Sequence, residues 1–170
     1  MMLRPVARLG AAVLQRTALP VEVFDAALGQ LIDDMIDTMY AAPGVGLAAP
    51  QVGVSLRVCV IDLSVGKRGG ELLTLVNPEF VSRDGMQLEE EGCLSLPGFT
   101  ATVPRPAEVT VRAADRHGEF RLIEAKGLLA RALQHELDHL EGRLFLDRLR
   151  GIQRELIVRK VRKMQRQGRW

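Results

Sequence analysis

The chain has 170 residues, of which 47% are hydrophobic and 26% charged, and its formal net charge is +2. These values are typical of one globular domain spanning 1–170, and they exclude a disordered or fibrous protein. Two cysteines are too few for a disulfide framework, and no apolar run reaches the length of a signal-peptide core or a membrane span. We therefore expect a cytoplasmic protein without membrane contact.

Helical spacing of apolar residues predicts a first helix over 21–40, whose Met and Phe side chains we expect in the core. Strand-like runs follow, with turns at 66–70, 84–85 and 117–118 between them. The predicted strands are 56–63, 72–76, 86–90, 101–103, 109–113 and 119–123. A second helix over 126–141 ends at Gly142 in a left-handed cap, and a third, over about 148–167, follows Asp147 as its N-cap. One helix, many short strands and then further helices predict an α+β fold.

Charge is distributed unevenly along the chain. Residues 148–170 contain nine Lys or Arg and one acidic residue, Glu155, whereas the rest of the chain has an acidic excess. Either a contact surface for a polyanion or a solvated helix face would explain this pattern.

The segment 134–139 reads Gln-His-Glu-Leu-Asp-His, an H-E-x-x-H motif within the second predicted helix. His135 and His139 are four residues apart, so both imidazoles can reach one cation from the same helix face. Glu136 lies beside that face, where it can take a proton from water at a metal without being a ligand. His117 falls in a predicted turn and is not expected to be a ligand.

A catalytic metal usually has a third protein ligand and an open position. Phe145 stands where a metzincin has histidine, and Glu155 is the downstream carboxylate that a thermolysin-like site would need. Upstream, Cys93 follows Gly92 in an irregular stretch that can hold a thiolate rigidly. We predict Cys93 as the third ligand, whereas Cys59, in an apolar strand, is expected to be a core residue.

The segment 44–51 reads Gly-Val-Gly-Leu-Ala-Ala-Pro-Gln and superficially resembles a dinucleotide fingerprint. It follows a predicted helix instead of a strand, and Pro50 would break the helix that the fingerprint must open, so we expect no nucleotide cofactor. Its two glycines instead allow another backbone to come close, as when an extended peptide adds to a strand edge. Gln51 is either a neutral amide donor near the site or an ordinary loop residue.

These motifs, at 44–51, 91–95 and 134–139, stand in the order in which bacterial peptide deformylases carry G-x-G-x-A-A-x-Q, E-G-C-L-S and Q-H-E-x-D-H. The chain resembles that family over most of its length, although the stretch 9–19 departs from the family's usual Pro-containing opening. The resemblance implies an α+β fold with antiparallel β-sheets packed around a central metal-binding helix, and with an N-terminal and a C-terminal helix.

By this resemblance, Cys93, His135 and His139 hold one divalent metal per chain, Fe(II) in the cell, which zinc, nickel or cobalt can replace. The implied reaction removes the formyl group from the N-terminal N-formylmethionine of nascent polypeptides and releases formate. Because the family acts at the ribosome, the resemblance also suggests that the basic helix contacts rRNA through its phosphates.

The resemblance assigns roles to further residues. Glu136 is the general base and then the acid, and the Gln51 amide and the Leu94 backbone N–H stabilise the oxyanion. The residues expected at the peptide are Val45, Gly46, Arg105, Leu128 and Ala132. From its place on the helix, Arg131 is expected to point to solvent, and Asp138 either orients a ligand or, as we favour, forms an ordinary ion pair.

Two other functions remain open from the sequence. One is an H-E-x-x-H metallopeptidase, which in its thermolysin-like form would not need Cys93. The other is a metal-stabilised binding module for formylated or N-terminal peptides. A structural metal would normally have a fourth protein ligand and no need of Glu136.

Overall fold

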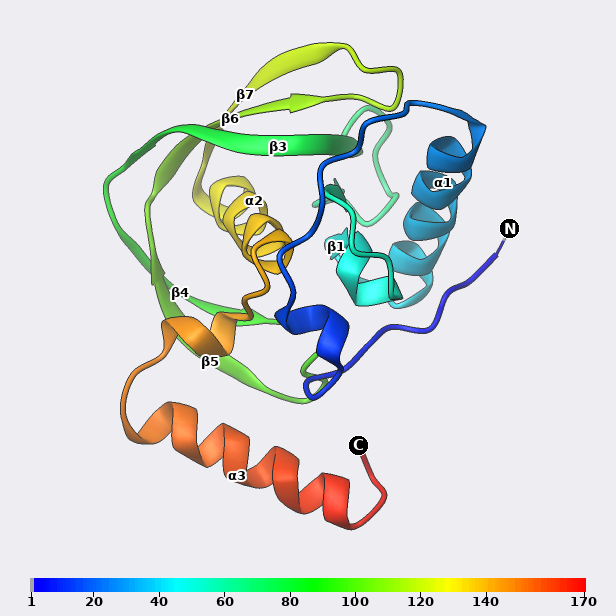
Figure 1. Ribbon diagram of the computed structural model, residues 1–170. Helices are drawn as coiled ribbons and strands as arrows, with labels where there is room; N and C mark the ends of the chain where they lie inside the picture. The colour runs from blue at the N-terminus through cyan, green and yellow to red at the C-terminus, as the bar shows by residue number, and fades with distance from the viewer. Residues whose placement is uncertain (1) are drawn as a thin grey trace.

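The computed structural model describes residues 2–170 and has an α+β architecture (Figure 1). The helix α2 (Gly127–Leu140) lies at the centre among the strands, with α1 (Ala26–Ala41) to one side and α3 (Ile152–Arg166) at the periphery. The predicted arrangement of sheets around a central helix is confirmed. No helix described within 2–170 is both long and apolar enough to span a membrane.

Two antiparallel sheets surround α2. The larger has the strand order β1-β2-β3-β6-β7, and the smaller pairs β4 with β5. Because β1 pairs only with β2 among residues 2–170, its other edge has no strand partner there. The strands are β1 (Gly46–Ala48), β2 (Val58–Ile61), β3 (Leu73–Asp84), β4 (Gln87–Gly92), β5 (Thr100–Arg105), β6 (Glu108–Ala114) and β7 (Phe120–Lys126). Three short 3-10 helices are η1 (Ala12–Gln15), η2 (Ala49–Val52) and η3 (Phe145–Arg148).

Apolar side chains form three clusters, of which the first includes α2. The first lies between α2 and the large sheet, and the second between α1 and strands β1 and β2. The third joins β5, η3 and α3. Met35 and Met39 of α1 are fully buried in the second cluster, as predicted. Burying one such side chain contributes roughly 1.5–3 kcal/mol to stability.

The first helix begins at Ala26 and not at residue 21. The side chain of Asp25 accepts a hydrogen bond from the Leu28 N–H at 3.0 Å and caps the helix. Residues before it stay extended because Asn77 binds both backbone groups of Val21, at 2.8 and 2.9 Å. This long-range contact overrides the helical periodicity.

Strand β3 runs to Asp84, far beyond the predicted end at residue 76. Its pairing with β6 shifts register between Val76 and Glu79, and Asn77 there adopts a φ of 51°. Pro78 is therefore tolerated at a bulge, where the ladder needs no N–H from it.

The third helix begins at Ile152, so the predicted N-cap role of Asp147 is wrong. The Asp147 carboxylate accepts from the Leu144 N–H at 2.9 Å within η3 instead. By contrast, Gly142 has the predicted left-handed conformation, with a φ of 74°. A Cβ on Gly142 would also lie 2.7 Å from the carbonyl oxygen of Gln15, because the N-terminal segment crosses the end of α2 there.

Candidate metal centre

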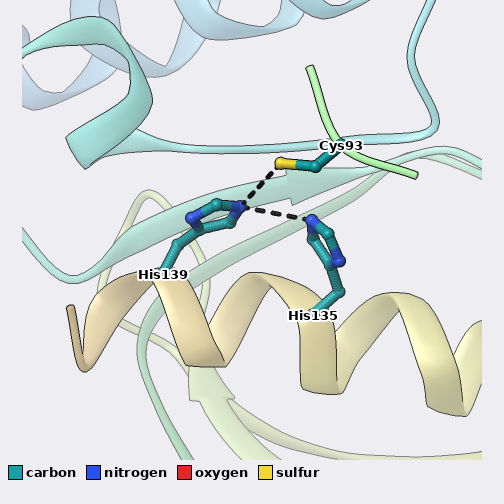
Figure 2. Close-up of side chains that lie close together, drawn as sticks. All are labelled: Cys93, His135 and His139. Atoms are coloured by element: carbon teal, nitrogen blue, oxygen red, sulfur yellow. Dashed lines mark hydrogen bonds between the residues drawn. The ribbon is translucent and has the colours of Figure 1, made fainter. Parts of the chain in front are cut away.

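Cys93, His135 and His139 converge on one point (Figure 2). Both histidines project from one face of α2, and Cys93 reaches them from the loop after β4. His139 Nε2 lies 3.4 Å from Cys93 Sγ and 3.2 Å from His135 Nε2, and the three ligand atoms lie within 4.8 Å of one another. We call this group the metal centre. Glu155, the alternative third ligand, is exposed on α3 and does not belong to it.

The loop after β4 holds Cys93 through its own backbone. The Leu96 N–H donates to the Cys93 carbonyl at 3.0 Å, and the fully buried Leu96 side chain anchors the turn. The Ser95 N–H donates to Cys93 Sγ at 3.4 Å, which helps to fix the position of the sulfur. Cys59 is fully buried in β2, where burial raises the pKa of its thiol, so it is the core residue that the sequence predicted.

Glu91, near the end of β4, orients His135. Its Oε2 lies 2.6 Å from His135 Nδ1, and its carboxylate also accepts from Arg105 at 2.7 and 2.8 Å and from Arg131 at 2.8 Å. Burial raises the pKa of Glu91, but the hydrogen bonds from Arg105 and His135 outweigh it and hold the pKa well below its usual range. The charged carboxylate keeps a proton on Nδ1 and leaves Nε2 as the ligand atom.

The electrostatics of the metal centre favour a cation. Burial lowers the pKa of His139, so its imidazole is neutral and has a lone pair to donate. Burial acts in the same direction on His135, but the negative groups of Cys93, Glu91 and Glu136 raise its pKa above the ordinary value. These groups stabilise positive charge where the ligand atoms meet, and a divalent metal supplies that charge. One thiolate with two imidazoles suits several such metals.

Glu136 is buried beside the metal centre, and its Oε2 has no hydrogen-bond partner among the described residues. Burial raises the pKa of its carboxyl to about 7. The side chain lies against β1, so closely that a Cβ on Gly46 would be 2.5 Å from Glu136 Oε1. A carboxyl group with this pKa can take up and return a proton near neutral pH.

Gln51 directs its amide toward the metal centre. Its Oε1 accepts from the Ala48 N–H at 2.9 Å, so Nε2 turns the other way, donating to Ser95 Oγ at 3.0 Å and lying 3.7 Å from Cys93 Sγ. The Leu94 N–H, in the loop between Cys93 and Ser95, donates no backbone hydrogen bond within residues 2–170.

A cavity of about 630 Å³ opens beside these residues. Val45, Gly46, Leu128 and Ala132, all predicted at the peptide, line it, and so does Glu136. The cavity thus includes the start of β1, at Gly46. Its further walls include Leu94, Leu96, Phe99 and Thr100.

Arg105 lies elsewhere than expected. It is 2% exposed, does not line the cavity, and donates to Glu91 and, at 2.9 Å, to Asp138. Arg105 thus acts on the metal ligands through Glu91, which binds His135, and it does not lie at the expected peptide position. Arg131, expected at the solvent, is also buried against Glu91. Asp138 forms the predicted ion pairs, with Arg105 and, at 2.6 Å, with Arg148.

Comparison with known proteins bears on the whole chain. The family model described as polypeptide deformylase matches residues 3–155. A peptide deformylase of Acidobacterium capsulatum is 49% identical over 170 residues, which cover 100% of both chains. The crystal structure of a peptide deformylase from Legionella pneumophila superposes with a TM-score of 0.91 at 50% identity, covering 99% of each chain. The peptide deformylase of Ehrlichia chaffeensis in complex with actinonin gives a TM-score of 0.89 at 36% identity, with coverage of 98% and 99%.

Proposed function

The chain belongs to the polypeptide deformylase family, and we propose that Glu136, Gln51 and the Leu94 backbone act on a formylated peptide at the metal centre. The protein is a metal-dependent hydrolase that removes the formyl group from N-formylmethionyl peptides. One observation carries the assignment of roles. The buried Glu136 carboxyl, with a pKa of about 7 and a free oxygen, lies beside the point where the three ligand atoms meet.

Glu136 would move the proton in both halves of the reaction. A divalent metal at the centre, when bound, polarises the formyl carbonyl and lowers the pKa of water. As water adds to the formyl carbon, Glu136 takes its proton, and it then gives a proton to the peptide nitrogen as the C–N bond breaks. Formate and a free amino terminus leave, and Glu136 is restored.

Gln51 and Leu94 would stabilise the negative charge that develops on the formyl oxygen. The Gln51 amide is already oriented by the Ala48 N–H before a peptide binds, so its dipole need not reorganise during the reaction. Loss of one such donor typically lowers turnover about 10²–10³-fold.

The cavity would hold the methionine side chain against Val45, Leu128 and Ala132. The peptide backbone would pair with the chain at Val45 and Gly46, where β1 begins. A peptide that adds to a strand edge gains main-chain hydrogen bonds whatever its side chains are. This arrangement explains how one enzyme can accept many nascent chains that share only their first residue.

Formate release from an N-formyl-Met peptide tests this function, with protein purified without oxygen and an N-acetyl-Met peptide as control. We expect release from the formyl peptide alone. Cleavage of an internal peptide bond would instead indicate a metallopeptidase. Tight binding of the formyl peptide without any formate would indicate a binding module.

We further propose that the resident metal is Fe(II) in the cell, and that zinc, nickel or cobalt can replace it. The support is the family and the mixed thiolate and imidazole donor set, which does not by itself select iron. Metal analysis of anaerobically purified protein tests the identity. Cys93→Ala should lose the metal, whereas Cys59→Ala, which removes the other free thiol, should keep it.

A contact between α3 and the ribosome is part of the same proposal, and its nascent-chain substrate would place the protein in the cytoplasm. Helix α3 lies at the periphery (Figure 1), and Arg159, Lys160 and Lys163 on it are exposed. Reversing these three charges to Glu should abolish co-sedimentation with ribosomes at low salt. Lys67→Glu, in an exposed turn far from α3 in the sequence, is the control. Equal co-sedimentation of both variants would refute the contact.

A further inference from the structure

We propose that Trp170 is a positioning residue of the active site, although it lies beyond α3. Its indole fixes a short N-terminal segment against the loop that carries Cys93, and it supports Phe99 in the cavity wall. The inference rests on the proposed roles of Gln51 and Leu94, because these are the groups that Trp170 would keep in place.

Residues 7–9, which we call the bridging segment, connect η2, which bears Gln51, with the Cys93 loop, which bears Leu94. The Ala7 N–H donates to the Gln51 carbonyl at 2.7 Å, and the Leu9 N–H donates to the Ser95 carbonyl at 2.9 Å. Gln51 Nε2 also donates to Ser95 Oγ. Two sets of hydrogen bonds therefore connect η2 with the Cys93 loop. One is between the side chains of Gln51 and Ser95, and the other runs through the backbone of the bridging segment.

Trp170 contacts the bridging segment through its indole. Its Nε1 donates to the Leu9 carbonyl at 2.8 Å, so both backbone groups of Leu9 are engaged. The guanidinium carbon of Arg8 lies 5.8 Å from the indole centroid, which adds a contact within the same segment. The bridging segment is thus held between the Cys93 loop and Trp170.

The same indole supports the cavity wall. The rings of Trp170 and Phe99 meet edge to face, with centroids 6.1 Å apart and planes at 60°, a favourable aromatic geometry. Phe99 lines the cavity and packs in the third apolar cluster together with Cys93 and Trp170. Loss of the indole would therefore remove a contact from Phe99 in the cavity wall and a hydrogen bond from Leu9 in the bridging segment.

Comparison of two substitutions separates this role from simple attachment of α3. Val161 is 2% exposed and fixes α3 to the same cluster, but it does not line the cavity. Trp170→Ala should lower kcat/KM about tenfold at full metal content, since a shift of about 1 Å in a reacting group can cost about 100-fold. Val161→Ala should lower the melting temperature at least as much as Trp170→Ala does. It should nevertheless leave kcat/KM within about twofold of the parent protein. Trp170→Phe should recover KM through the ring contact with Phe99 but not kcat, because it lacks the N–H.

Trp170 is the only tryptophan of the chain, so its fluorescence reports on this contact directly. An unformylated Met peptide, the reaction product, should shift its emission with a half-saturation that matches inhibition of formate release. Val161→Ala should keep this shift. An emission unchanged at inhibitory peptide concentrations, or equal loss of kcat/KM in Trp170→Ala and Val161→Ala, would overturn the inference. A Gln51→Leu variant with normal turnover would instead refute the proposed role of that donor.

Discussion

Replacing Gly46 with Ala tests whether the position of the Glu136 carboxylate limits the reaction. A Cβ on Gly46 would lie 2.5 Å from Glu136 Oε1, 3.1 Å from Cδ and 3.2 Å from Cγ. Gly46 has an ordinary φ, so Ala fits the backbone of β1 and the conflict is confined to this contact. The glycine is therefore needed for the space it leaves to the carboxylate.

The expected loss follows from the distance that Glu136 must move. Ordinary contact with a Cβ begins at 3.4 Å, so the oxygen must retreat by about 1 Å. A displacement of about 1 Å in a reacting group can lower turnover about 100-fold, which corresponds to about 2.7 kcal/mol in activation free energy. Crowding in the core should also destabilise the fold by roughly 1–3 kcal/mol.

Formate release at equal metal content measures the effect, and Gly29→Ala is the matched control. A Cβ on Gly29, within α1, meets nothing within 4 Å. That substitution should leave turnover unchanged and stabilise the helix by roughly 0.5–1 kcal/mol. If Gly46→Ala is folded, holds its metal and turns over within about threefold of the parent protein, the position of Glu136 does not limit the rate.

Three other results are expected. Glu136→Gln should keep the fold and the metal but lose about 10²–10⁴-fold in formate release, and retained turnover would count against its role as the base. Glu91→Gln leaves two buried guanidinium groups facing a neutral amide, so urea denaturation should show a loss of roughly 3–5 kcal/mol, and a loss below about 1 kcal/mol would contradict this. Burial and the hydrogen bond to Asp62, at 2.6 Å, raise the pKa of Tyr40 to about 12. Because this folded-state pKa is raised, the contribution of Tyr40 to stability is complete below the unfolded value of about 10 and is lost as pH rises through about 12. Tyrosinate absorbance of this single tyrosine measures the titration; Asp62→Asn should lower the midpoint, and a midpoint near 10 in the folded parent protein would exclude the effect.

The sequence was sufficient to predict the ligand set, because each ligand stands in a motif with a local physical meaning. The spacing of His135 and His139 requires only that 134–139 be helical, and the irregular stretch around Cys93 marks it as different from Cys59. The α+β class and the central helix could be predicted for the same reason, since changes of periodicity are local.

Residues that act through distant partners could not be predicted. Glu91 stands two residues before Cys93, but its role depends on His135, Arg105 and Arg131, which are far along the chain. The resemblance placed Arg105 at the peptide, but its ion pairs with Glu91 and Asp138 hold it in the interior, and neither partner could be inferred from its own position. The early start predicted for α1 failed likewise, because Asn77 holds Val21 in an extended conformation.

The separation of the ligands along the chain also has a consequence for biosynthesis. Cys93 follows β4, whereas both histidines belong to α2, and three strands lie between them. While the chain is being synthesised, Cys93 is made before α2. At that stage a metal can bind only to an isolated thiol, since a preformed site rarely exists before folding. Metal acquisition must therefore wait until α2 has packed between the sheets. A newly made copy of this hydrolase thus becomes active only after the chain has been made at least to the end of α2.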